Sequence, residues 1–141
     1  MKIGWIEISV KQYGGDTYNA QGREALRKEH NVELVSCEAK AFAAFRPLKL
    51  VESLFRLVSL RGTKDVWVRD FYSTVTMPFD RTKGKQVVMI HHVDFSGFPW
   101  WARMGAKVAE KVFYRNLKKV DAIITVSDYW RDHFISRGYS N

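Results

Sequence analysis

Five short apolar runs punctuate the chain and predict the strands of a sheet. The runs have little polar character on either face, as expected for parallel strands that are covered on both sides. Their predicted limits are residues 3–10, 32–37, 65–69, 86–91 and 122–126.

Most of the segments between these runs have the 3.6-residue periodicity of helices. Asp16 or Thr17 can cap the first helix, prolines open the next two, and Ser127 can cap the last. The predicted helices cover residues 16–30, 47–60, 99–119 and 128–137, whereas residues 71–84 are predicted as a loop with room for one helical turn. This alternation predicts one domain over residues 1–141, an α/β fold with a Rossmann-like parallel sheet and helices on both faces.

The same periodicity predicts which side of each helix faces the core. In the second helix, which Gly62 is expected to end, the apolar face comprises Leu48, Val51, Leu54, Phe55 and Val58. In the long helix after Pro99 it comprises Trp101, Gly105, Val108, Val112, Leu117 and Val120, opposite Arg103, Lys107, Lys111, Tyr114 and Lys118. In the first helix, Ala25 and Leu26 are expected to face inward, and Arg23, Arg27 and Lys28 outward.

The composition fits one globular domain and favours an anionic partner. Of the 141 residues, 46% are hydrophobic, which is enough for a core, and the net charge of +8 indicates a nucleic acid, a phosphorylated substrate or a membrane surface. Cys37 is the single cysteine, so no intrachain disulfide can form and a reducing, cytoplasmic location is expected, with peripheral membrane contact left open. Glu7 interrupts the first apolar run, so no signal peptide is predicted, and no uncharged run approaches the ~20 residues that span a bilayer.

The first candidate site is Gly14-Gly15-Asp16, between the first strand and the first helix. Backbone N–H groups at a helix N-terminus can bind a phosphate, and glycine lets the ligand approach them. No Gly-Lys-Ser/Thr and no third glycine follow, so the segment matches neither the Walker nor the dinucleotide-binding pattern. A simple turn is the alternative interpretation.

The second candidate site is His91-His92, with Asp94 nearby, at the end of the fourth strand. Open α/β proteins bind ligands at the carboxyl ends of their strands. Adjacent strand residues point to opposite faces and only Asp94 adds a carboxylate, so we expect no metal site. One histidine is expected to hydrogen-bond a substrate or exchange a proton with it; a structural histidine is the alternative.

Arg69-Asp70 and Ser127 follow the third and fifth strands and therefore belong to the same edge of the sheet. Without further context, a local ion pair is the simplest interpretation of Arg69-Asp70. Ser127 is expected to cap a helix rather than to act as a nucleophile, because no Gly-x-Ser-x-Gly elbow surrounds it.

The basic face of the long helix begins beside Trp100-Trp101. Aromatic residues next to Lys and Arg are typical of helices that rest on anionic lipid. The helix at 47–60 is a second candidate for such contact, because Leu50, Leu57 and Leu60 widen its apolar stripe. Buried tryptophans and solvated lysines are the alternative.

The chain resembles GT-B glycosyltransferases of the retaining group 1 (family 4-like) class most clearly near its C-terminal end. Their D-x-I-I-x-V-S strand matches the segment from Val120 to Ser127, and their aromatic-bearing helix matches Asp128-Tyr129-Trp130. The strand before Gly14-Gly15 and the strand ending in His91-His92 occur in that family's order, so the resemblance covers nearly the whole chain. The resemblance implies that the chain is the N-terminal, acceptor-side domain of a glycosyltransferase. Such an enzyme transfers a sugar from a nucleotide-sugar to a sugar or lipid-linked acceptor and retains the configuration of the sugar. The resemblance implies no cofactor and no obligatory metal.

The resemblance also implies roles for individual residues. Gly14 and Gly15, with Asp16 beside them, would lie against the donor diphosphate, and His92 or His91 near the transferred sugar. We assign the remaining polar residues of the edge to its acceptor side: Arg69, Asp70, Asp94 and Ser127.

Members of that family continue into a second Rossmann domain that holds most of the donor site. Such a domain is expected beyond Asn141, so the chain alone is expected to lack detectable transfer and to bind sugar nucleotides weakly. The alternative function is a stand-alone basic α/β module that binds nucleic acid or another polyanion without catalysis.

Overall fold

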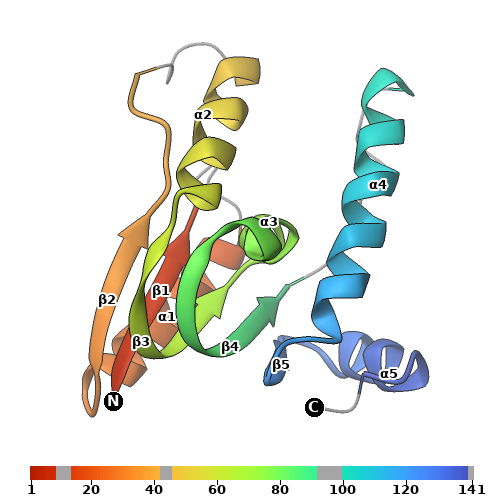
Figure 1. Ribbon diagram of the computed structural model, residues 1–141. Coiled ribbons are helices and arrows are strands. Elements are labelled where there is room, and N and C mark those ends of the chain that lie inside the picture. Colours follow the sequence, from red (N-terminus) through yellow and green to blue (C-terminus); the bar gives the residue numbers. More distant parts are fainter. Residues whose placement is uncertain (9–13, 42–45, 92–99, 140–141) are drawn as a thin grey trace.

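The computed structural model describes residues 1–8, 14–41, 46–91 and 100–139, and within them the chain forms a five-stranded sheet (Figure 1). All neighbouring strands are parallel, in the order β2-β1-β3-β4-β5. The strands are β1 (Lys2–Glu7), β2 (Asn31–Ser36), β3 (Arg61–Arg69), β4 (Arg81–Ile90) and β5 (Ala122–Thr125). The predicted Rossmann-like α/β class is therefore confirmed.

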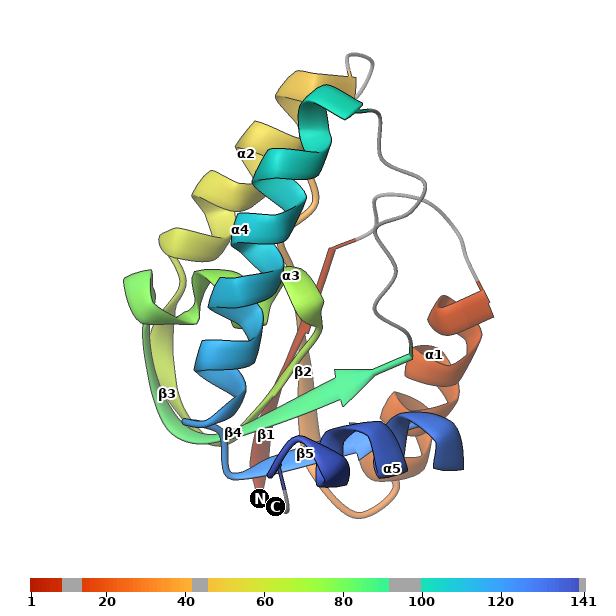
Figure 2. The ribbon, with the colours of Figure 1, turned by 90° about the vertical axis from the view of Figure 1, so that its right-hand side faces the viewer.

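Helices cover both faces of the sheet. Figure 2 shows α1 on one side and α2, α3 and α4 together on the other, with α5 beside β5. The elements are α1 (Gly14–Arg27), α2 (Arg46–Val58), α3 (Phe71–Thr76), the 3₁₀ turn η1 (Met77–Phe79), α4 (Trp100–Leu117) and α5 (Asp128–Ser136). Gly138 ends α5 with a φ of 81°, as its position in the sequence predicts.

Alternation along the strands divides the core into two layers. Ile3 and Trp5 face α1, where they pack with Val68 and Leu26. Side chains of the opposite parity face α2, α3 and α4. They form one group around Ile6, Leu57 and Trp67 and another around Val88, Phe113 and Leu117.

The prediction for residues 71–84 and the strands beside them was partly wrong. Residues 71–76 form α3, and β3 and β4 begin earlier than predicted, at Arg61 and Arg81. The added halves of both strands are mostly exposed and charged, so they carry no apolar run. Gly62, expected to end a helix, lies instead in β3 with a φ of 138°.

The predicted core faces of two helices were also partly wrong. In α2, Leu48, Val51 and Phe55 are exposed, and Ser53 and Leu57 are fully buried instead. In α4, Gly105 and Val108 are exposed, although Leu117 is buried as predicted. The sequence pattern misleads because polar side chains occupy core positions: Asn116 of α4 is fully buried and donates to the carbonyl oxygens of Thr74 and Val75.

In α1, two of the five predicted orientations were wrong. Ala25 is exposed, while Arg23 is largely buried and pairs with Glu7 at 3.2 Å. Leu26 packs in the core, and Arg27 and Lys28 face solvent, as predicted. The side chains of Leu50 and Trp101, and Pro99 as a whole, lie outside the described part of the structure.

The thiol of Cys37 is expected to be nearly inert in the folded protein. It packs beside Ile6 and Leu57 with 2% of its surface exposed, and burial raises its pKa from 9.0 to about 11. Only the thiolate attacks a disulfide reagent, so we expect the native chain to react with Ellman's reagent at least about a hundredfold more slowly than the urea-unfolded chain. Comparable rates would contradict the burial. Because the unfolded thiol loses its proton near pH 9 and the folded thiol near pH 11, stability is also expected to fall as pH rises through this interval.

Candidate functional site

The strand order marks one edge of the sheet as the place for a ligand. The chain passes from β1 outward to β2, and then returns across β1 to β3. In open α/β sheets a crevice forms outside the carboxyl ends of the strands at such a reversal. Here such a crevice is expected between β1 and β3, and α3 follows β3 on the face opposite α1 (Figure 2).

His91 reaches this crevice from β4. It follows Met89 by two positions, and Met89 faces the α1 side, so the strand pattern directs His91 toward α1 as well. Its Nε2 lies 3.1 Å from Oδ1 of Asn19, and its ring centroid is 6.0 Å from that of Tyr18. The end of β4 and the first half of α1 are therefore in direct contact across the end of β3.

The glycine pair lies at the start of α1. Gly14, Gly15 and Asp16 are the first three residues of the helix, rather than the turn before it. The first N–H groups of a helix have no intrahelical acceptor, so they can bind an anion. The side chain of Asp16, and His92 and Asp94 altogether, lie outside the described residues.

Glu7 and Arg23 fix α1 to the end of β1. The Arg23 guanidinium lies 3.2 Å from the Glu7 carboxylate, and its side chain is only 14% exposed. This pair and Asn19 were not singled out in the sequence. An Asn and an Arg four residues apart on a predicted helix were the available signal, because such residues share a face.

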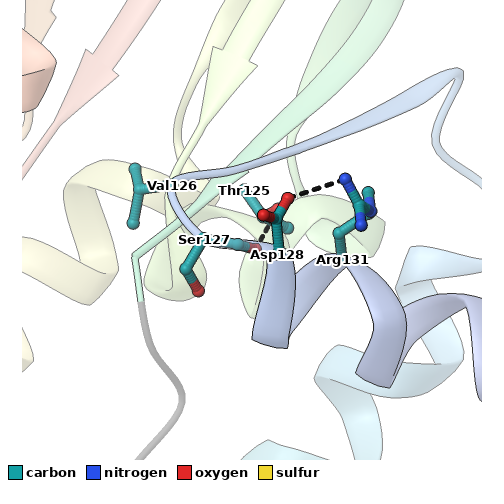
Figure 3. A pocket seen from close by; sticks show the side chains of 5 residues that line it. All are labelled: Thr125, Val126, Ser127, Asp128 and Arg131. Atoms are coloured by element: carbon teal, nitrogen blue, oxygen red, sulfur yellow. Dashed lines mark hydrogen bonds and ion pairs between the residues drawn. The ribbon is translucent and has the colours of Figure 1, made fainter.

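Ser127 lies at the end of β5, next to the end of β4. Ile90 pairs with Thr125, so the two strand ends are adjacent. Ser127 caps α5, and its hydroxyl accepts from the N–H of Trp130 at 3.4 Å, as predicted. An open pocket of about 350 Å³ surrounds it and is lined by Thr125, Val126, Ser127, Asp128 and Arg131. Figure 3 shows these side chains.

Arg69 points away from the crevice into the protein. Its side chain is fully buried and pairs with Asp80 at 2.8 Å, not with Asp70. It also donates to the carbonyl oxygen of Ser73 and to the side chains of Thr82 and Gln86. All of these contacts join β3, α3 and β4, so they indicate a structural role.

Asp70 caps α3. Its carboxylate accepts from the N–H of Ser73 at 2.8 Å and from the Ser73 hydroxyl at 2.6 Å. Burial raises the pKa of Asp70 above its usual value, while the Ser73 hydrogen bonds act in the opposite direction. The carboxylate is thus engaged in the first turn of the helix.

The structure therefore brings together His91, Asn19, Tyr18 and the start of α1, with the β5–α5 turn next along the edge. Across the described residues, no three His, Cys, Asp or Glu side chains gather as metal ligands. Nor does any helix in that part of the chain have the length and apolarity needed to cross a bilayer. Comparisons with protein-family models, with curated proteins and with solved structures found no match.

Proposed function

We propose that this chain is the acceptor-side domain of a glycosyltransferase that uses a nucleotide-sugar donor and retains the configuration of the sugar. The observation that carries the proposal is the contact between His91 and Asn19, which joins the end of β4 to the helix that begins with Gly14-Gly15. A donor has an anionic diphosphate and a neutral sugar side by side. The free N–H groups at the start of α1 can bind the diphosphate, and the polar side chains of Asn19 and His91 can hydrogen-bond the sugar.

In this proposal the backbone N–H groups of Gly14 and Gly15 hold the diphosphate. His91 and Asn19 hydrogen-bond hydroxyl groups of the sugar, and the turn at Ser127 borders the acceptor. The departing diphosphate needs stabilisation of its negative charge, which the resemblance assigns to a second domain. The chain alone is therefore expected to bind donors weakly and to leave them intact.

An NMR titration of the ¹⁵N-labelled chain with UDP-, GDP- and ADP-sugars tests the proposal. We expect shifts in the first turn of α1 and around His91. Replacing His91 with alanine should weaken binding about threefold to tenfold, the effect of losing one hydrogen bond. Gly15→Val should weaken it further, because the added side chain blocks approach to the backbone.

His30→Ala is the matched control, since His30 precedes β2 at the opposite edge of the sheet. It should leave binding unchanged. The proposal fails if no donor shifts the crevice residues, or if His30→Ala and His91→Ala have equal effects. Micromolar affinity or turnover would contradict the expected need for a second domain.

A further inference from the structure

Helix α2 presents an apolar stripe to solvent. Leu48, Val51 and Phe55 are 41%, 46% and 67% exposed, and their spacing of three and four residues places them on one side of the helix. Ser53 and Leu57, both fully buried, define the opposite side. The stripe therefore points away from the sheet, although its residues are large and hydrophobic.

Helix α4 has a similar outer side. Met104 and Val108, four residues apart, are 75% and 62% exposed. The side that faces the protein contains Phe113 and Leu117, which pack on Val88 of the sheet. A helical projection at 100° per residue places Met104 and Val108 nearly opposite these core residues.

The two stripes belong to the same side of the molecule. Both α2 and α4 contact α3, and all three helices cover one face of the sheet (Figure 2). Tyr72 of α3 packs with Leu57 of α2, and Phe71 of α3 packs with Phe113 of α4. Each stripe lies opposite the side chains that pack on α3 and the sheet, so both stripes are open to solvent. We call these five residues the outer face: Leu48, Val51, Phe55, Met104 and Val108.

The charges next to the outer face are mainly positive. Helix α4 has four basic residues and one acidic residue, Glu110. Lys107, Lys111 and Arg115 are exposed beside the Met104–Val108 stripe. On α2, Lys49 pairs with Glu38 and Arg56 with Glu52. A partner of this face should therefore be apolar in its interior and anionic at its surface.

We propose that the outer face binds an anionic lipid bilayer. The five apolar side chains enter the boundary between headgroups and acyl chains, and the cations of α4 contact lipid phosphates. This arrangement is independent of the crevice at His91.

Vesicle co-sedimentation tests this proposal. The chain is expected to pellet with phosphatidylglycerol/phosphatidylcholine vesicles and to stay in solution with pure phosphatidylcholine, with binding weakened by salt. Lys107→Glu with Lys111→Glu should lower the affinity about thirtyfold or more, because each basic residue near such a surface contributes about fivefold to the affinity. Phe55→Ser with Met104→Ser should also reduce binding, without changing net charge.

Matched controls separate the face from general charge and hydrophobicity. Lys28→Glu with Lys83→Glu changes the net charge as much as the double substitution in α4 does, but at exposed positions in the α1–β2 turn and in β4. Ile135→Ser removes an exposed apolar side chain from α5. Both controls should bind like the unchanged chain. Thermal melting checks that every variant is folded, which is expected because the replaced side chains are exposed.

Three results would overturn the proposal. One is equal recovery in the supernatant with both kinds of vesicle. A second is self-association in analytical ultracentrifugation that Phe55→Ser abolishes, which would assign the outer face to a second copy of the chain. The third is tight, salt-sensitive binding of oligonucleotides that needs Lys107 and Lys111 but not Phe55, which would favour the polyanion-binding alternative.

Discussion

Replacing Gly84 with alanine is expected to lower the free energy of unfolding by at least about 3 kcal/mol. Gly84 lies in β4 with a φ of 129°, a conformation that side chains rarely allow. A Cβ atom there would lie 2.0 Å from the backbone oxygen of Lys64 in β3. The neighbouring ladder has a register shift between Thr63 and Val66, so the close approach belongs to the irregular part of this pair.

Thermal and urea unfolding measure this effect, and we expect the melting temperature to fall by about 10 °C or more. Gly105→Ala is the matched control, because nothing lies within 4 Å of a Cβ at that exposed position of α4. It should stabilise the protein by about 0.5–1 kcal/mol through helix propensity. If Gly84→Ala has the same free energy of unfolding as the unchanged chain, the backbones of β3 and β4 can move apart at this position. The native fold would then not depend on the close approach of Gly84 to Lys64.

Arg69→Met is expected to destabilise the protein by about 3–5 kcal/mol. The substitution leaves the Asp80 carboxylate, with 2% of its side chain exposed, without its cation. It also removes the donors to Ser73 and Gln86, which lie 2.9 Å and 2.6 Å from the guanidinium. Unpaired buried charges and acceptors carry the full cost of their lost hydration.

A double-mutant cycle distinguishes this cause from simple loss of packing. Asp80→Asn in the Arg69→Met background removes the unpaired charge and should recover part of the stability, giving a coupling of about 1–3 kcal/mol. Arg131→Met is the control, because the Arg131–Asp128 pair is exposed and its loss should stay within about 0.5 kcal/mol. Strict additivity of the two core substitutions would show that the ion pair contributes no specific interaction.

The sequence predicted the elements that carry a buried apolar run or a common helix-capping residue. The apolar runs located β1, β2 and β5, and Ser127 located the start of α5. The amino halves of β3 and β4 were missed because charged, exposed residues such as Arg61 and Lys83 form them. Helix α3 was predicted only as room for one turn in a loop, because it follows an Asp70–Ser73 capping box with a short β-branched and aromatic segment, which favours strand by propensity.

The candidate site was predictable only in part, for a related reason. A strand that ends in histidine is visible in a sequence, and His91 does reach the edge of the sheet. The partners of Arg69 are not visible, because Asp80, Thr82 and Gln86 are unremarkable residues that tertiary structure brings together. Leu48, Val51 and Phe55 of α2 and Val108 of α4 were mistaken for core, because helical periodicity indicates an apolar side of a helix but not what covers it.

The pairing of β3 with β4 also has a consequence for the order of assembly. Arg61 faces Arg81, 20 positions later, whereas Ile3 of β1 faces Val66 of β3, 63 positions later. Loop-closure entropy grows with the logarithm of loop length, so bringing β3 and β4 together costs about 1 kcal/mol less than bringing β1 and β3 together. The buried guanidinium of Arg69 then joins β3, α3 and β4 of this short βαβ crossover. Residues 61–90 are therefore the segment that can acquire native contacts before the two ends of the chain have met.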